Sequence, residues 1–207
     1  MRHLLFAAAL TATGLIATAA DAAVVRFDAI TANWININPV SDYVTATGNG
    51  TDSPSLNWGR DAGYGLSGYD FDAGPYVPHD VIVPPNADSF TLAAFTHRNK
   101  PIYAPTLNSV TLEVNINILI DGLDQGWRSF YFDFEHNETP NYGAICCNDL
   151  ITVSFNDLSE DFIVGTDVYT VNILGFETSP GVTTTSFSTV EGTDNTANLI
   201  AAVTYCS

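Results

Sequence analysis

Basic side chains are scarce in this 207-residue chain, which has 6 Lys and Arg against 23 Asp and Glu and a formal net charge of −17. So acidic a chain is repelled by nucleic acid and by anionic lipid, and we expect neither as a partner. The acidity does not indicate disorder, because hydrophobic residues make up 46% and aromatic residues 12% of the sequence. The composition instead favours one folded domain.

Helical periodicity is also missing beyond the N-terminal apolar run. Between residues 110 and 121, apolar side chains alternate with mostly polar ones at period two, which places one set in a core and the other towards water. Other strand-like segments, separated by Gly, Asp, Ser and Pro, cover residues 24–30, 34–38, 43–47, 55–58, 66–71, 89–95, 127–135, 150–155, 168–177, 183–190 and 198–205. The pattern predicts an all-β fold, an antiparallel β-sandwich or jelly roll of roughly nine to twelve strands.

The N-terminus has the pattern of a secretory signal peptide. Arg2 precedes a short apolar run rich in Leu and Ala, and Ala20 and Ala22 offer small residues for cleavage. The run is too short and too rich in Ala for a membrane span. We therefore expect residues 1–22 to be removed during Sec-type export, leaving a single β-sandwich domain over residues 23–207.

Cysteine is rare, with only Cys146, Cys147 and Cys206 in the chain. Export favours a disulfide, and adjacent cysteines rarely pair because the peptide between them must distort. We predict a bridge from Cys206 to Cys146 or Cys147. A bridge between the two neighbours, with Cys206 left as a thiol, is the alternative.

A polar string, Thr96-His97-Arg98-Asn99 followed by Pro101, is predicted to form the turn after the strand at residues 89–95. It resembles the signature of the THxN family of PEP-CTERM proteins. Further matching segments are Trp34, Asn57-Trp58-Gly59, Ser67-Gly68-Tyr69, Glu138-Thr139-Pro140-Asn141, Asn148-Asp149, the strand from Tyr169 to Phe176, and Phe187 to Glu191.

The resemblance implies an exported bacterial β-protein associated with exopolysaccharide, and it implies no particular chemistry. The Pro-Glu-Pro motif, membrane helix and basic tail that end such proteins do not occur in this chain. We therefore expect a secreted product with no membrane anchor.

His97 has two interpretations. As a metal ligand or general base it would need partners, and the sequence supplies no second His or Cys at a short ligand spacing. The favoured interpretation is structural: Thr96, His97 and Asn99 hydrogen-bond neighbouring backbone and fix the turn.

Two other groups of residues are candidate sites. Asp133 and Glu135 share one strand face about 7 Å apart, with Glu138 just beyond, as in some polysaccharide hydrolases. Asp121 and Asp124 lie in a glycine-containing turn that could bind calcium, as in a calcium-stabilised carbohydrate-binding module.

The non-enzymatic interpretation is favoured for the whole chain. We expect a structural, adhesive or binding role in an extracellular matrix, with polysaccharide or surface proteins as partners and no required cofactor. Exposed aromatic residues between Trp58 and Tyr76 would offer a sugar-stacking platform, although tryptophan is more often buried. The alternative is a hydrolase using Asp133 and Glu135.

Overall fold

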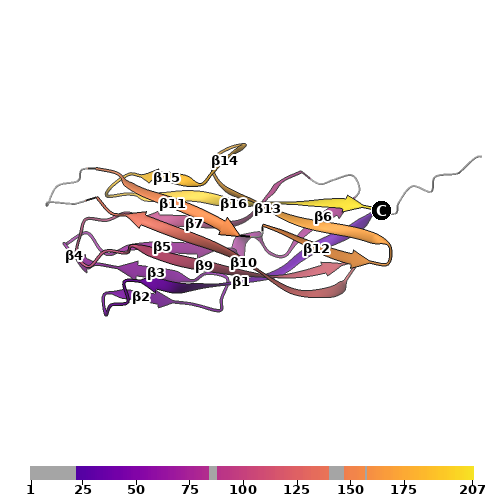
Figure 1. Cartoon of the computed structure of the whole chain (residues 1–207), viewed down its shortest axis with the longest axis horizontal. Helices are drawn as coiled ribbons and strands as arrows, with labels where there is room; N and C mark the ends of the chain where they lie inside the picture. Colours follow the sequence, from indigo (N-terminus) through magenta and orange to yellow (C-terminus); the bar gives the residue numbers. More distant parts are fainter. Residues whose placement is uncertain (1–21, 84–87, 140–146, 157) are drawn as a thin grey trace, which may run out of the picture.

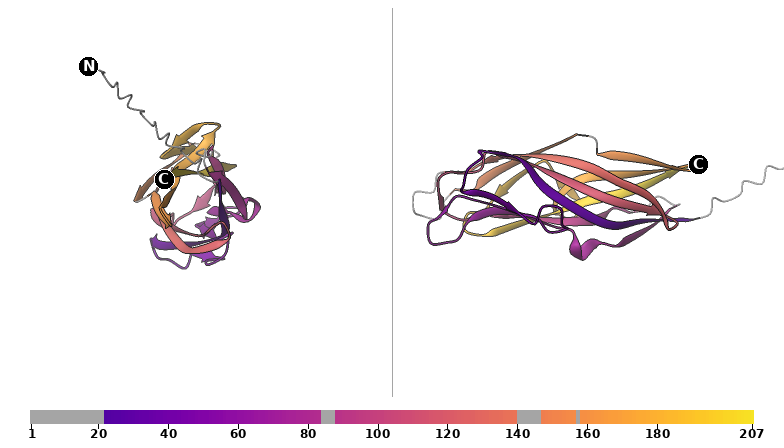
Figure 2. Two further views of the ribbon diagram at one scale, coloured as in Figure 1. Left: turned by 90° about the vertical axis from the view of Figure 1, so that its right-hand side faces the viewer. Right: turned by 90° about the horizontal axis from the view of Figure 1, so that it is seen from below.

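The chain folds into two antiparallel sheets that face each other along a common long axis (Figure 1). The computed structural model describes residues 22–83, 88–139, 147–156 and 158–207. Viewed end-on, the sheets curl around a shared core (Figure 2). The described residues contain no α-helix, only the short 3-10 turn η1 (Gly74–Tyr76), and no helix among them is long and apolar enough to cross a membrane. The predicted all-β sandwich is confirmed.

The first sheet has six strands in the order β15-β11-β10-β9-β1-β6. Its strands are β1 (Ala23–Asn38), β6 (His79–Val83), β9 (Ser109–Ile120), β10 (Leu123–Asn137), β11 (Asp149–Asn156) and β15 (Ser186–Thr189). The centre of this sheet is the long β9, which pairs with β1 on one side and β10 on the other.

The second sheet runs in the order β12-β13-β16-β7-β5-β3-β2, with β14 paired to β13. Its strands are β2 (Val44–Thr47), β3 (Ser55–Trp58), β5 (Ser67–Asp72), β7 (Phe90–Arg98), β12 (Ser159–Val164), β13 (Asp167–Ser179), β14 (Val182–Thr184) and β16 (Asp194–Cys206). Two short strands, β4 (Arg60–Asp61) and β8 (Ile102–Tyr103), form a separate pair.

Several strands are longer than the sequence predicted. The two segments predicted at 24–30 and 34–38 form the single strand β1, because it stays paired with β9 across two irregularities in register. The string beginning at Thr96 is the end of β7 and not a turn, since Thr96, His97 and Arg98 pair with both β5 and β16. Strand β10 likewise continues through Asn137.

Asp121 and Asp124, the two aspartates considered for calcium, lie in and just after the turn between β9 and β10, where their carboxylates accept backbone hydrogen bonds. Asp121 and Gly122 both have positive φ angles, 49° and 78°, as a tight two-residue hairpin requires. Asp121 Oδ1 accepts from Val24 N at 2.9 Å, and Asp124 Oδ1 accepts from Gly126 N at 2.7 Å, beside a bulge in β10. The Asp121 carboxylate therefore ties the turn to β1, and the Asp124 carboxylate holds the bulge in β10.

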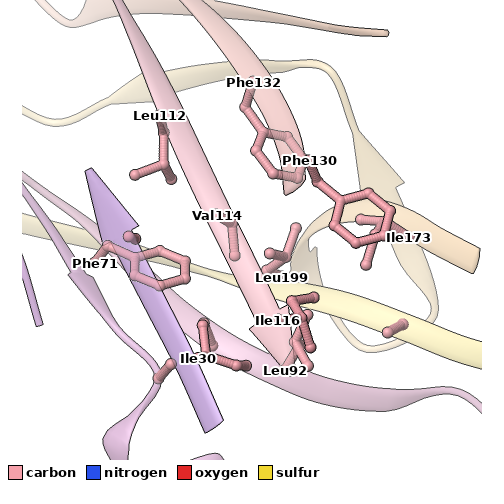
Figure 3. Close-up of a cluster of buried hydrophobic side chains, with 14 of the residues drawn as sticks. Ile30, Phe71, Leu92, Leu112, Val114, Ile116, Phe130, Phe132, Ile173 and Leu199 are labelled. Atoms are coloured by element: carbon pink, nitrogen blue, oxygen red, sulfur yellow. The ribbon is translucent and has the colours of Figure 1, made fainter. Parts of the chain in front are cut away.

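The core lies between the sheets and is built from the inward positions of the alternating strands. In Figure 3, Leu112, Val114 and Ile116 of β9 lie in the same cluster as Phe71 and Leu92 from the opposite sheet. All five are at most 1% exposed. Burial of each such side chain is worth about 1.5–3 kcal/mol relative to leaving it in water.

The predicted disulfide between Cys206 and Cys147 is wrong, and Cys146 lies outside the described residues. Cys206 is a free thiol at the exposed end of β16, whereas Cys147 is exposed near Thr139, whose hydroxyl donates to its carbonyl. Thr139 lies near the opposite end of the sandwich, and β16 alone spans about 40 Å at the usual rise per residue. A disulfide requires Cα atoms within about 7 Å.

Candidate functional site

A cluster of polar side chains lies between the sheets, where β7 and β10 end. The inward positions of β7 include Phe95 and then His97, and those of β10 include Phe134 and then His136. The rings of Phe95 and Phe134 stack with centroids 4.9 Å apart, and those of the two histidines are 5.1 Å apart. Period-two alternation in facing strands thus brings both histidines into the same layer of the core.

His97 is fully buried, and one of its ring nitrogens is held in place. Its Nδ1 lies 2.9 Å from Thr189 Oγ1, and Asn99 Nδ2 donates to the Thr189 carbonyl at 3.2 Å. The indole of Trp58 stacks on the imidazole, with centroids 5.6 Å apart. His97 Nε2 is buried and has no hydrogen-bond partner among the described residues.

His136 is held from both sides. Its Nδ1 lies 2.7 Å from the Tyr69 hydroxyl, and its Nε2 lies 3.1 Å from Glu138 Oε2. The same Nε2 is 3.8 Å from Asp149 Oδ2. Glu138 Oε2 also accepts from Trp58 Nε1 at 3.4 Å.

Asp149 begins β11 and is completely buried. Its Oδ1 accepts from the backbone N and the hydroxyl of Thr139, at 2.8 and 3.0 Å, whereas its Oδ2 has no hydrogen-bond partner in the described ranges. One atom each of His97, His136 and Asp149 lie within 4.8 Å of one another, and so do oxygens of Glu138, Asp149 and Glu191. The cluster therefore combines two imidazoles with three carboxyl groups.

Burial controls the protonation of these groups. Desolvation, followed by the nearby His136, holds the pKa of His97 well below its ordinary value, so its imidazole is neutral. Desolvation and the charge of Glu138 raise the pKa of Asp149, and burial raises that of Tyr69 well above its ordinary range. Ionised carboxylates are therefore costly here unless a cation balances them.

The cationic side chains of the described residues are engaged elsewhere. Their partners are Asp80 for Arg26, the Ala104 carbonyl for Arg60, Asp70 for Arg98, Asp194 for Lys100 and Glu160 for Arg128. None of these pairs involves Asp149, the completely buried carboxyl group of the cluster.

The other residues of the Thr-His-x-Asn string lie beside this cluster or on the outer face of β7. Thr96 Oγ1 lies 2.9 Å from Thr196 Oγ1, and Asn99 contacts Thr189, so the string links β7 to β16 and β15. Arg98 lies on the outer face and donates to Asp70 Oδ2 at 2.6 Å. Pro101, just beyond, is buried. Asn99 donates to backbone as predicted, whereas Thr96 and His97 pair with threonine hydroxyls and not with backbone. The string also lies at a strand end and not in a turn.

The three carboxylates considered for hydrolysis are not brought together. Asp133 and Glu135 lie on the outer face of β10, as predicted, and Asp133 Oδ1 accepts from Thr111 Oγ1 at 2.6 Å. Glu138 turns inward to His136. A surface hollow beside Glu135 is lined also by Asn137, Thr152 and other residues, but not by Asp133.

Comparison with known proteins found no family model and no curated relative that matches this chain, so the geometry carries the functional argument.

Sequence reasoning missed His136 as the partner of His97, because the strand was expected to end at Glu135. The usable signal was the alternation itself: continuing Phe132 and Phe134 by one step places His136 inward. The same alternation, continued back from Val153 and Ile151, places Asp149 inward, but the strand was expected to begin at Leu150.

Proposed function

We propose that this chain is an exported β-sandwich protein that binds polysaccharide outside the cell through the outer face of its first sheet. The observation that carries the proposal is a pair of exposed aromatic side chains on this face, Trp127 and Tyr131, which are 48% and 40% exposed. They are four residues apart on β10, hence about 13 Å apart along the strand.

Hydrogen-bonding groups lie beside these rings. Tyr131 donates to Glu113 Oε1 at 3.1 Å, and Asn33 donates to the other oxygen of Glu113 at 2.8 Å. Ser129, between the two aromatic residues, donates to Asn115 at 2.6 Å. These contacts cross β10, β9 and β1, so the face presents a preformed array of donors and acceptors at low conformational cost.

Such a surface suits sugars. Aromatic rings offer apolar faces to the C–H groups of a pyranose, while Asn, Ser, Glu and Tyr can pair with its hydroxyls. With a net charge of −17, the protein favours neutral or cationic chains over acidic ones. In the segment from Trp58 to Tyr76, where the platform was expected, Trp58 and Tyr69 are fully buried and Tyr64 is 58% exposed, and we place the platform on β10 instead.

Binding is better supported than hydrolysis. Asp133 and Glu135 project from the same outer face, where Glu135 is exposed and Asp133 is bound by Thr111. Glycosidases hold a pair of carboxyl groups on opposite sides of the scissile bond. Here the third candidate, Glu138, belongs to the buried cluster instead.

We expect Trp127→Ala and Tyr131→Ala each to weaken binding to a soluble neutral glucan or to chitosan by about 30-fold, which corresponds to about 2 kcal/mol for an interface hot spot. Neither change should lower the melting temperature by more than about 2 °C, because both rings are on the surface. Affinity electrophoresis in gels containing each polysaccharide measures the first effect and thermal denaturation the second.

Tyr103→Ala is the matched control, since Tyr103 is 59% exposed but lies on β8, outside the first sheet. It should bind like the unmodified protein. Equal retardation of all four proteins, or of none, would contradict the proposed face.

A further inference from the structure

We propose that His97, His136 and Asp149, together with Glu138, bind a divalent transition-metal ion of the zinc class between the two sheets. The proposal is independent of polysaccharide binding, because its residues face the core and not the outer surface.

The donor atoms already converge. His97, His136 and Asp149 each offer one atom within 4.8 Å of the others, and Glu138 Oε2 is 3.1 Å from His136 Nε2. Zinc takes four ligands at about 2.0–2.2 Å, so donor atoms on a common tetrahedron lie about 3.3–3.6 Å apart. Small side-chain movements would therefore complete the ligand set.

Two buried atoms point to a ligand that neighbouring residues do not supply. His97 Nε2 and Asp149 Oδ2 each have no hydrogen-bond partner within the described part of the chain, although both residues are fully buried. Leaving a buried polar atom unpaired lowers the stability of the fold. Their positions in one cluster let a single cation satisfy both.

The remaining nitrogens are held as they usually are in metal sites. His97 Nδ1 lies 2.9 Å from Thr189 Oγ1, and His136 Nδ1 lies 2.7 Å from the Tyr69 hydroxyl. When each Nδ1–H donates to its oxygen, each Nε2 carries a lone pair. Metal-ligating histidines commonly have such a partner, which fixes the tautomer and the orientation of the ring.

Charge also favours a cation. Glu138, Asp149 and Glu191 bring the oxygens of three carboxyl groups within 4.8 Å of one another. A divalent ion would balance two of these charges.

The donor chemistry selects the class of metal. Two imidazoles suit zinc and related transition metals, whereas calcium and magnesium prefer sites made only of oxygen. The four residues are nearly or completely buried, which is typical of a closed structural site and not of a catalytic one with an open position. Bound there, the ion would join β7 of one sheet to β10 and β11 of the other.

The test uses the purified chain, stripped with chelator and titrated with zinc. We expect one ion per chain by elemental analysis after dialysis, and a rise in melting temperature of about 5–10 °C at a hundredfold excess over Kd. His97→Ala and His136→Ala should each weaken zinc binding by at least about 100-fold, since losing a supporting contact alone costs 10–100-fold. His79→Ala is the matched control, because His79 stacks on Phe90 away from the cluster.

Two conservative variants keep the test decisive if the alanine variants fail to fold. Asp149→Asn removes a ligand and a buried charge, so the metal-free protein should fold while the zinc-induced rise in melting temperature disappears. Tyr69→Phe should keep the stoichiometry and weaken affinity by about 10–100-fold. The proposal is overturned if the unmodified chain binds no stoichiometric zinc, or if Asp149→Asn binds zinc as well as the unmodified chain does.

Discussion

Phe134→Ala should lower the free energy of unfolding by about 3–5 kcal/mol, the usual cost of removing a buried aromatic ring. Phe134 is completely buried, and its ring lies against Trp34, Tyr69, Phe95 and Phe176, with centroids 4.9 to 6.0 Å apart. These partners come from both sheets, so the cavity would open at the centre of the sandwich. For a domain of this size, the melting temperature should fall by about 6–20 °C.

Thermal and denaturant unfolding of Phe134→Ala and Phe134→Leu would measure this effect. The leucine variant keeps most of the apolar volume and should be less destabilised than the alanine variant. If the two variants lose the same stability, cavity formation does not explain the result. A loss below about 1 kcal/mol for Phe134→Ala would show that this ring does not occupy the core.

Gly68→Ala should be the second severe change. Gly68 is buried on β5, and an added Cβ would lie 2.5 Å from the Leu56 carbonyl oxygen and 2.1 Å from the Arg98 guanidinium. Contacts this short require the backbone of β3 or β5 to shift. We expect a loss of about 1–3 kcal/mol or more, as for overpacked sites, measured by denaturant unfolding.

A double-mutant cycle with Arg98 separates the clash with the Arg98 side chain from the clash with the Leu56 backbone. Arg98 donates to Asp70 and Asn57 across the position of Gly68, so Arg98→Ala relieves the side-chain clash but not the one with the backbone. The combined variant should therefore lose less stability than the sum of the single variants. Strict additivity would show that Arg98 does not lie over Gly68.

Much of the fold follows from the period-two pattern. The alternation from Val110 to Ile120 predicted the central strand, and β9 occupies Ser109–Ile120. Strand ends were less predictable, because β7 and β10 continue through polar residues that tertiary pairing holds in place. The short β12 was not predicted, because only Phe162 of its residues is buried and the strand shows no clear alternation, although it forms a hairpin with β13 that closes between Val164 and Asp167.

The candidate site was only half predictable. The sequence marked His97, but its partners come from β10, β11 and the segment around Thr189, which no local spacing connects. Strand alternation fixes which side of a sheet a residue faces, and it does not say which strands will face each other. The predicted disulfide failed for the same reason, because sequence gives no distance between Cys147 and Cys206.

The most direct test of the metal site is X-ray absorption spectroscopy of the zinc-loaded protein. We expect a first shell of nitrogen and oxygen at about 2.0–2.2 Å, with the outer scattering of two imidazoles and no sulfur. His97→Ala and His136→Ala should each lose imidazole scattering, while His79→Ala should keep the spectrum of the unmodified protein. A sulfur shell near 2.3 Å would place the ion at a cysteine, and a shell without imidazole would place it on surface carboxylates. Either result would contradict a metal site between the two sheets.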